Sequence, residues 1–102
     1  MSWYKLDKNN NPVKARDIDD YMKWHDENID KVTVMRQDVD GITISTVFLG
    51  LDHSYPGDNT KPLLWETMIF GGEHDQYQER YYSFDDAVDG YFKALELVIK
   101  NK

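Results

Sequence analysis

The residue types best suited to catalysis or metal binding gather around the middle of the chain. Asp52 and His53 follow an apolar run that ends at Leu51, and Glu66 interrupts the next apolar run, LLWETMIF. Carboxylate oxygens and an imidazole nitrogen suit zinc or manganese, and they also form general acid–base pairs. His74 would add a second imidazole if the ends of the two runs meet. These residues define a catalytic hypothesis for the sequence.

The same residues also have a structural interpretation, which the sequence favours. Asp52 and His53 are adjacent, whereas metal-binding motifs usually space their ligands so that two side chains converge. No nucleophile, phosphate loop or metal-spaced pair accompanies them. In the structural interpretation, Asp52 bonds backbone N–H groups of a loop, His53 packs at a strand end, and Glu66 pairs across strands with a residue such as Arg80. Glu66 remains the strongest candidate, because a carboxylate between apolar neighbours must find a partner or protonate.

Composition excludes several classes of protein. The chain has 102 residues, 40% of them hydrophobic and none of them cysteine. Disulfides, thiolate catalysis and cysteine-ligated metal sites are therefore excluded, and a reducing compartment fits best. The first residues, MSWYKLDKNN, lack the apolar core of a signal peptide. No apolar run approaches the roughly 20 residues of a membrane span. We expect a single domain, 1–102, located in the cytoplasm.

The charge balance narrows the range of partners. Nineteen acidic residues against twelve basic residues give a formal net charge of −7. A field of this sign repels phosphate backbones and anionic membranes, so we expect neither direct nucleic-acid binding nor membrane binding. The pattern also indicates no cofactor and no metal. A protein partner is the remaining expectation, with solubility as the alternative reason for the charge.

The first third of the chain predicts a hairpin and a helix. The hairpin joins residues 3–6 to a return at Val13 through an asparagine-rich turn. Asp17 is an N-cap residue for the helix, and Asp19 and Asp20 suit its first turn. Apolar and half-polar residues recur at helical spacing and predict one core-facing stripe: Ile18, Tyr21, Met22, His25 and Ile29.

The rest of the chain predicts strands followed by a closing helix. Asp40 and Gly41 form the pair preferred in a tight hairpin turn, between a strand near 32–39 and one at 42–51. Residues 52–62 read as a loop, 63–70 as a strand, and 79–82 as a last strand. Ser83 caps a final helix with an apolar stripe. The order ββαββββα predicts an α+β fold: a single antiparallel sheet of about four to five strands with two helices on one face.

Three segments carry a resemblance to known sequences: STVFLGLDH, PLLWETMIFGG and ERYYSFDDAVDGY. Over roughly residues 42–92 the chain resembles a group of small uncharacterised phage and bacterial proteins that share the pattern STVFLGLDH, a loop, and PLL[FW]ETM[IV]FGG. The resemblance implies a phage or prophage origin and assigns no catalytic residue. Many members have a histidine after the glycine of the closing helix, where this chain has Tyr91, which argues against an indispensable histidine there.

The leading functional hypothesis is an accessory protein that modulates a host or phage protein. Its contact surface would be the acidic face of the first helix, which could imitate the spaced charges of nucleic acid. An aromatic side chain beside those acids would anchor the interface. The expected protein-binding residues are Asp19, Asp20, Trp24, Asp26 and Glu27. The alternatives are a small metal-dependent or acid–base enzyme centred on Asp52, His53 and Glu66, and an oligomeric part of a virion.

Overall fold

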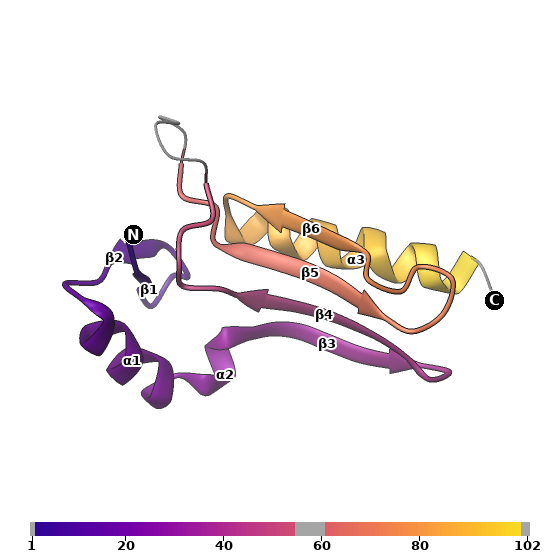
Figure 1. Cartoon of the computed structure of the whole chain (residues 1–102), viewed down its shortest axis with the longest axis horizontal. Coiled ribbons are helices and arrows are strands. Elements are labelled where there is room, and N and C mark those ends of the chain that lie inside the picture. The colour runs from indigo at the N-terminus through magenta and orange to yellow at the C-terminus, as the bar shows by residue number, and fades with distance from the viewer. Residues whose placement is uncertain (1, 55–60, 101–102) are drawn as a thin grey trace.

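The computed structural model describes residues 2–54 and 61–100 as an α+β fold (Figure 1). Two short strands open the chain, and two helices follow them. Four longer strands and a closing helix make up the rest. In order, the elements are β1 (Tyr4–Leu6), β2 (Pro12–Lys14), α1 (Ile18–Glu27), α2 (Ile29–Val32), β3 (Thr33–Val39), β4 (Ile42–Phe48), β5 (Trp65–Phe70), β6 (Gln78–Tyr81) and α3 (Phe84–Lys100).

The last four strands form one antiparallel sheet in the order β3-β4-β5-β6. Asp40 and Gly41 connect β3 to β4 with φ angles of 50° and 83°, so the predicted tight turn is confirmed. The register shifts between Thr33 and Met35 at the start of β3, where a bulge interrupts the pairing with β4. Because β3 and β6 are the outer strands, each has one edge that pairs with no other strand among the described residues.

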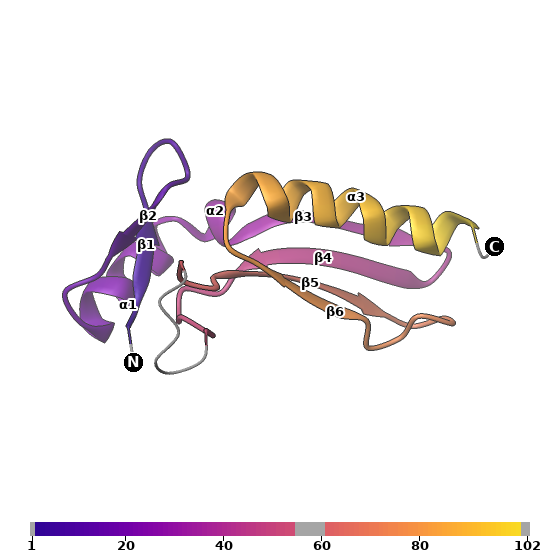
Figure 2. The same ribbon diagram turned by 90° about the horizontal axis from the view of Figure 1, so that it is seen from above.

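Helix α3 covers one face of this sheet and packs against all four strands (Figure 2). Ser83 caps the helix as predicted, since its Oγ accepts a hydrogen bond from the N–H of Asp86 at 3.1 Å. The sheet side chains beneath it come from alternate positions, among them Ile44 and Ile69. Gly90 leaves room for a side chain of the sheet, because a Cβ built there would lie 2.0 Å from the Tyr81 hydroxyl.

The opposite face of the sheet carries a mixture of polar and apolar side chains. It includes Val47, Met68 and Phe70, and Phe70 is 43% exposed. Arg36, Asp38, Thr43, Ser45, Gln78 and Arg80 complete this face around Glu66. An antiparallel sheet with one packed face and one solvated face has this composition.

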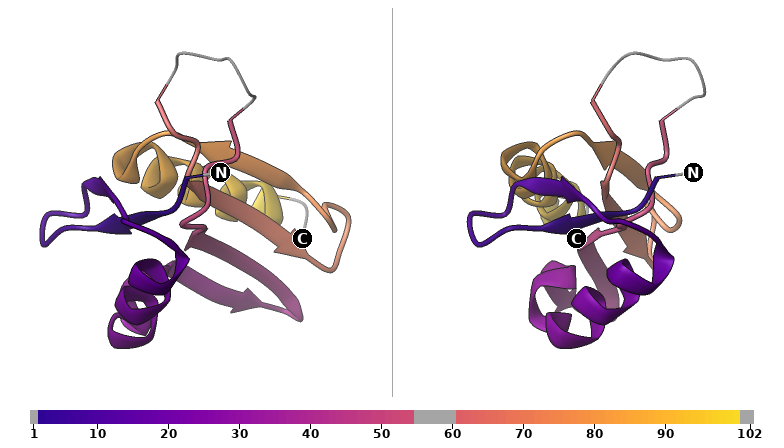
Figure 3. Two further views of the ribbon diagram at one scale, coloured as in Figure 1. Left: turned by 60° about the vertical axis from the view of Figure 1, so that its left-hand side comes forward. Right: turned by 90° about the vertical axis from the view of Figure 1, so that its left-hand side faces the viewer.

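The β1–β2 hairpin, α1 and α2 lie at one end of the four-stranded sheet (Figure 3). Their buried side chains join those at the near ends of β4 and β5 in one cluster. Tyr21 of α1 is 6% exposed, and its ring lies 4.8 Å from that of Trp3. Gly50, at φ +79°, leaves room for Tyr21, since a Cβ at this position would lie 2.3 Å from the ring. The close packing fixes α1 against the sheet end.

The core-facing stripe predicted for the first helix is wrong at three of its five positions. Ile18, Met22 and Ile29 are 49%, 45% and 56% exposed. Tyr21 and the half-buried His25 do face the protein as predicted, and the buried side of α1 continues through the half-buried Trp24 instead of through the aliphatic positions. The large aromatic rings bury more apolar area than the aliphatic side chains, so the helix is rotated to place the rings inward. The helix also ends at Glu27, and Ile29 starts the separate helix α2.

The α+β fold class is confirmed, with two details that the sequence did not show. The N-terminal hairpin forms its own two-stranded sheet instead of joining the larger one. Only α3 lies across the four-stranded sheet, whereas α1 packs on β1 and at the end of that sheet. The antiparallel strands 42–48 and 65–70 have the predicted alternation, with Ile44, Phe48 and Ile69 buried.

Candidate functional site

Asp52 organises the backbone where the β4–β5 connection begins. Its Oδ1 accepts hydrogen bonds from the N–H of Ser54 at 2.9 Å and of Leu63 at 3.0 Å. Burial raises the pKa of the Asp52 carboxyl, but these backbone donors outweigh burial and hold that pKa below its usual 3.8. The contacts are those of the structural interpretation, in which this carboxylate bonds a loop's N–H groups.

His53 is half-buried beside the same backbone. Its N–H donates to the carbonyl oxygen of Leu63 at 3.0 Å, and its ring Nδ1 lies 2.6 Å from the carbonyl oxygen of Leu51. A ring nitrogen at this distance from a carbonyl is the donor, so the second nitrogen, Nε2, carries the lone pair in the neutral ring. The histidine is therefore oriented by main-chain atoms instead of by an acidic side chain.

Glu66 is 8% exposed on the face of the sheet opposite α3. Its Oε2 accepts a hydrogen bond from Arg80 Nε at 2.9 Å, and Gln78 Nε2 donates to the same oxygen. Arg80 is the residue directly across the strand pair from Glu66. The predicted cross-strand partner is confirmed, and it supplies the compensation that a buried carboxylate requires.

The Asp52 and Glu66 carboxylates are held by separate sets of partners. Asp52 is held at Leu63, three residues before Glu66, which is about 10 Å along an extended chain. The Glu66 carboxylate is held by side chains of β6 on the open face. His74 follows the far end of β5, so β5 separates it from His53 (Figure 1). Within residues 2–54 and 61–100, no group of three acidic or histidine side chains is placed to hold a metal ion.

The proposed protein-binding residues of α1 divide into two groups. Asp19, Asp26 and Glu27 are exposed. Asp20 has only 11% of its side chain exposed, because Lys5 Nζ lies 3.1 Å from it and the Arg16 N–H donates to it at 3.0 Å. These donors keep the pKa of Asp20 below its usual value.

Trp24 also turns towards the protein and does not supply an exposed anchor. Its ring meets that of Phe48 edge-on at 5.6 Å. Tyr21, the other aromatic residue of α1, is buried. Trp24 and Asp20 therefore stabilise the position of α1, whereas Asp19, Asp26 and Glu27 remain available for contact with a partner.

Ile18 and Met22 are functional candidates that the sequence prediction placed in the core. They stand one turn apart on α1, next to Asp19 and Asp26 on the helix surface. Both are about half exposed, so α1 combines apolar and acidic side chains on its outer surface. The sequence contained a signal for this exposure. Apolar residues cover more of the circumference of α1 than one packing face needs, so some of them must face outwards.

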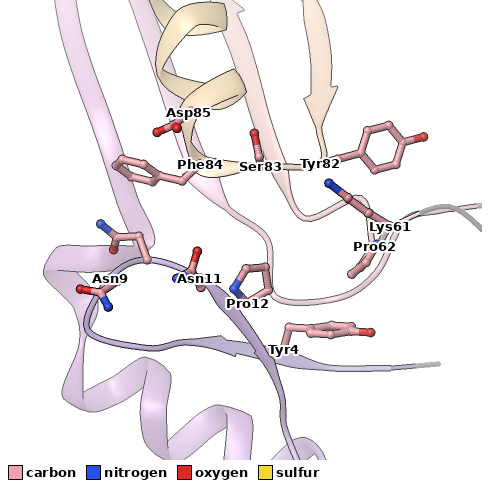
Figure 4. Close-up of a pocket in the computed structure, with 11 residues that line it drawn as sticks. Tyr4, Asn9, Asn11, Pro12, Lys61, Pro62, Tyr82, Ser83, Phe84 and Asp85 are labelled. Atoms are coloured by element: carbon pink, nitrogen blue, oxygen red, sulfur yellow. The ribbon is translucent and has the colours of Figure 1, made fainter.

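A pocket of about 520 Å³ lies between the β1–β2 hairpin and the start of α3 (Figure 4). Three segments line it: residues 4 and 9–12, residues 61–62, and residues 82–85. The N-terminal hairpin turn forms one wall, and the β6–α3 corner forms the other (Figure 4). No local sequence pattern predicts this pocket, because its lining segments are distant in the chain and meet only in the folded protein.

Among the described residues, no helix is both long and apolar enough to cross a membrane.

Comparisons with known proteins do not add to this picture. No protein-family model, curated protein or solved structure matches the chain.

Proposed function

We propose that this protein is a small phage-type accessory protein that binds a basic protein partner through the outer surface of α1. The observation that carries the proposal is the exposure of Ile18 and Met22 beside three exposed acids of the same helix. We call this surface, formed by Ile18, Asp19, Met22, Asp26 and Glu27, the α1 surface. An apolar pair with polar, solvent-accessible side chains beside it matches the general arrangement of protein interfaces, in which a polar rim flanks an apolar centre.

The two kinds of side chain perform different tasks in binding. The chain's net charge of −7 and the acids of the α1 surface attract a basic partner over a long range and speed its association. Ile18 and Met22 then bury apolar area against the partner, which slows dissociation. The same spacing of carboxylates would let α1 compete with nucleic acid for a basic nucleic-acid-binding protein.

The α1 surface is preorganised for such a contact. Asp17 caps the helix by accepting the N–H of Asp20 at 2.8 Å. Tyr21 and Trp24 fix the opposite side against aromatic rings of the sheet end. A helix already held in place loses little conformational entropy on binding, so more of the contact energy becomes affinity.

A charge-reversal experiment tests the proposal. The variant Asp19→Lys, Asp26→Lys, Glu27→Lys leaves the internal Asp20 contacts intact and changes the net charge by six. The matched control, Glu73→Lys, Glu79→Lys, Asp89→Lys, makes the same change at exposed acids outside α1. Each protein is used to capture partners from bacterial lysate at low and high salt. We expect the wild type and the control to retain one basic partner at low salt and the α1 variant to lose it.

The apolar half of the surface has its own test. Met22→Ser with Ile18→Ser removes the anchors without changing charge, and should weaken capture at both salt concentrations. Phe92→Ser, at a residue 51% exposed on α3, is the control. Capture that survives both α1 variants, or that is lost equally in the controls, would contradict the proposal.

A further inference from the structure

Five of the eleven residues that line the pocket between the hairpin and α3 carry rings. Tyr4 and Pro12 belong to the hairpin, Pro62 to the approach to β5, and Tyr82 and Phe84 to the β6–α3 corner. Figure 4 shows the side chains of Tyr4 and Tyr82 at the same end, with Pro62 between them. Tyr82 is 41% exposed, so the rim of the pocket presents a large aromatic surface to solvent.

The opposite end of the pocket supplies hydrogen-bond donors. Asn10 takes the left-handed conformation that asparagine tolerates, with φ 63°, and its neighbours Asn9 and Asn11 lie below Phe84 and Ser83 (Figure 4). Side-chain amides donate hydrogen bonds. Lys61 adds an ammonium donor at the end of the pocket near Tyr82 (Figure 4). Among the described residues that line the pocket, Asp85 is the single carboxylate.

From these two features we infer that the pocket binds a proline-containing peptide in the polyproline II conformation. Such a peptide has ring faces that pack on tyrosine and proline, and its carbonyl groups are free to accept hydrogen bonds. Aromatic-lined grooves recognise this preformed conformation at a small entropic cost. The volume of about 520 Å³ lies within the range of ligand pockets, about 300–1,000 Å³.

Charge indicates what should flank the prolines. Asp85 lies in the pocket, and Asp86 follows it in the first turn of α3, where both are exposed. Lys61 is on the other wall, at the end near Tyr82 (Figure 4). A lysine or arginine next to the proline segment would therefore be attracted to the Asp85 end. The occupant to which we commit is a proline segment with one flanking basic residue, supplied by another protein.

Titration by two-dimensional NMR tests this inference on the full chain labelled with nitrogen-15. The probe is a synthetic hexaproline peptide carrying one terminal arginine. We expect saturable shifts at the amides of residues 9–11 and 82–85. A peptide of equal length and charge with alanine in place of proline should cause much smaller shifts. Equal binding of both peptides, or no binding of the proline peptide, would overturn the inference. Saturable shifts with maltotriose and none with the proline peptide would also overturn it, by identifying a carbohydrate pocket.

Substitution of Tyr82 separates recognition from folding. Tyr82→Ala should weaken binding about tenfold, the usual effect of removing an aromatic anchor. Tyr82→Phe keeps the ring and should retain most of the affinity. Phe92→Ala, which removes an exposed ring of α3 outside the pocket, should bind as the wild type does. A Tyr82→Ala variant that is folded and binds unchanged would place the peptide elsewhere.

This inference is independent of the α1 surface. The charge-reversed α1 variant should bind the proline peptide normally at physiological salt, where distant charges are screened. Loss of peptide binding in that variant would contradict a separate site.

Discussion

Arg80 Nε lies 2.9 Å from the Glu66 carboxylate, across the antiparallel pair of β5 and β6. Glu66 was the strongest catalytic candidate in the sequence, but its role here is structural. The positive charge of Arg80 compensates the negative charge of the buried Glu66 carboxylate. A carboxylate held in this way keeps the open face of the sheet polar without exposing an unpaired charge to apolar neighbours such as Met68.

Removing the arginine should therefore destabilise the fold. Arg80→Ala leaves the Glu66 carboxylate, 8% exposed, without its charged partner and should lower the free energy of unfolding by about 1–3 kcal/mol. Arg36→Ala is the control, since Arg36 lies 3.9 Å from Asp38 and both are exposed, and it should change stability by less than about 0.5 kcal/mol. Urea unfolding measures both. Equal losses of stability in the two variants would show that the buried Glu66–Arg80 pair contributes no more than an exposed ion pair.

The substitution Gly90→Ala should change stability in the direction opposite to the usual effect of replacing a helical glycine with alanine. Such a change normally stabilises a helix by up to about 1 kcal/mol. Here the new Cβ would meet the Tyr81 ring, with the hydroxyl at 2.0 Å, so Gly90→Ala should destabilise by about 1–3 kcal/mol. In a Tyr81→Ala background the overlap is absent, and the same change should become neutral or stabilising. A thermal-unfolding cycle of the four proteins tests the sign; destabilisation in both backgrounds would mean that Tyr81 is not the cause.

Asp52 should contribute to stability in a pH-dependent manner. Its pKa is below 3.8 in the folded protein and returns to about 3.8 on unfolding, so the unfolded state binds the proton more readily. The stabilisation is complete above about pH 5 and is lost as pH falls through the folded pKa. Asp52→Asn should be less stable near neutral pH and should lose less on acidification than the wild type. Asp89→Asn, at an exposed position of α3, should keep the wild-type profile; identical slopes for all three proteins would contradict this role.

The orientation of α1 predicts that substitutions at two neighbouring residues will lower stability by very different amounts. Tyr21→Ala removes a ring that is 6% exposed and should cost about 3–5 kcal/mol, as large-to-small core changes do. Met22→Ala changes a side chain that is 45% exposed and should stay within about 0.5 kcal/mol. Chemical denaturation distinguishes them. An effect of Met22→Ala as large as that of Tyr21→Ala would instead support the predicted stripe, in which both side chains face the core.

Local chemistry explains which parts of this fold the sequence predicted well. Asp40 and Gly41 specify a turn that few other pairs allow, and the alternation along 42–48 then assigns each side chain to a face. Asp17 and Ser83 cap helices by contacts with residues three positions away. Arg80 was also named correctly as a partner of Glu66, because adjacent antiparallel strands joined by a short connection place such residues opposite one another.

Features that depend on distant segments were not predictable in the same way. The stripe predicted for α1 was partly wrong because the helix carries both aliphatic and aromatic residues that could face the core. Contacts with the distant rings of Trp3 and Phe48 bury the aromatic residues of α1. The pocket required the hairpin to dock beside Tyr82 and Phe84, which no local pattern encodes. For the candidate site, residue types suggested the chemistry, but their partners, visible only in the fold, determine what each carboxylate can do.

The outer strand β3 has a consequence for how this protein behaves at high concentration. Within residues 2–54 and 61–100, the outer edge of the seven-residue strand β3 pairs with no other strand, and such an edge can template another copy and lead to aggregation. The bulge near Met35 breaks the straight run, and the opposite charges of Arg36 and Asp38 would have to be desolvated by an incoming strand. The two charged residues therefore protect the edge of β3 from pairing with another copy. Replacing both with valine should make the edge of β3 prone to aggregation through edge-strand pairing.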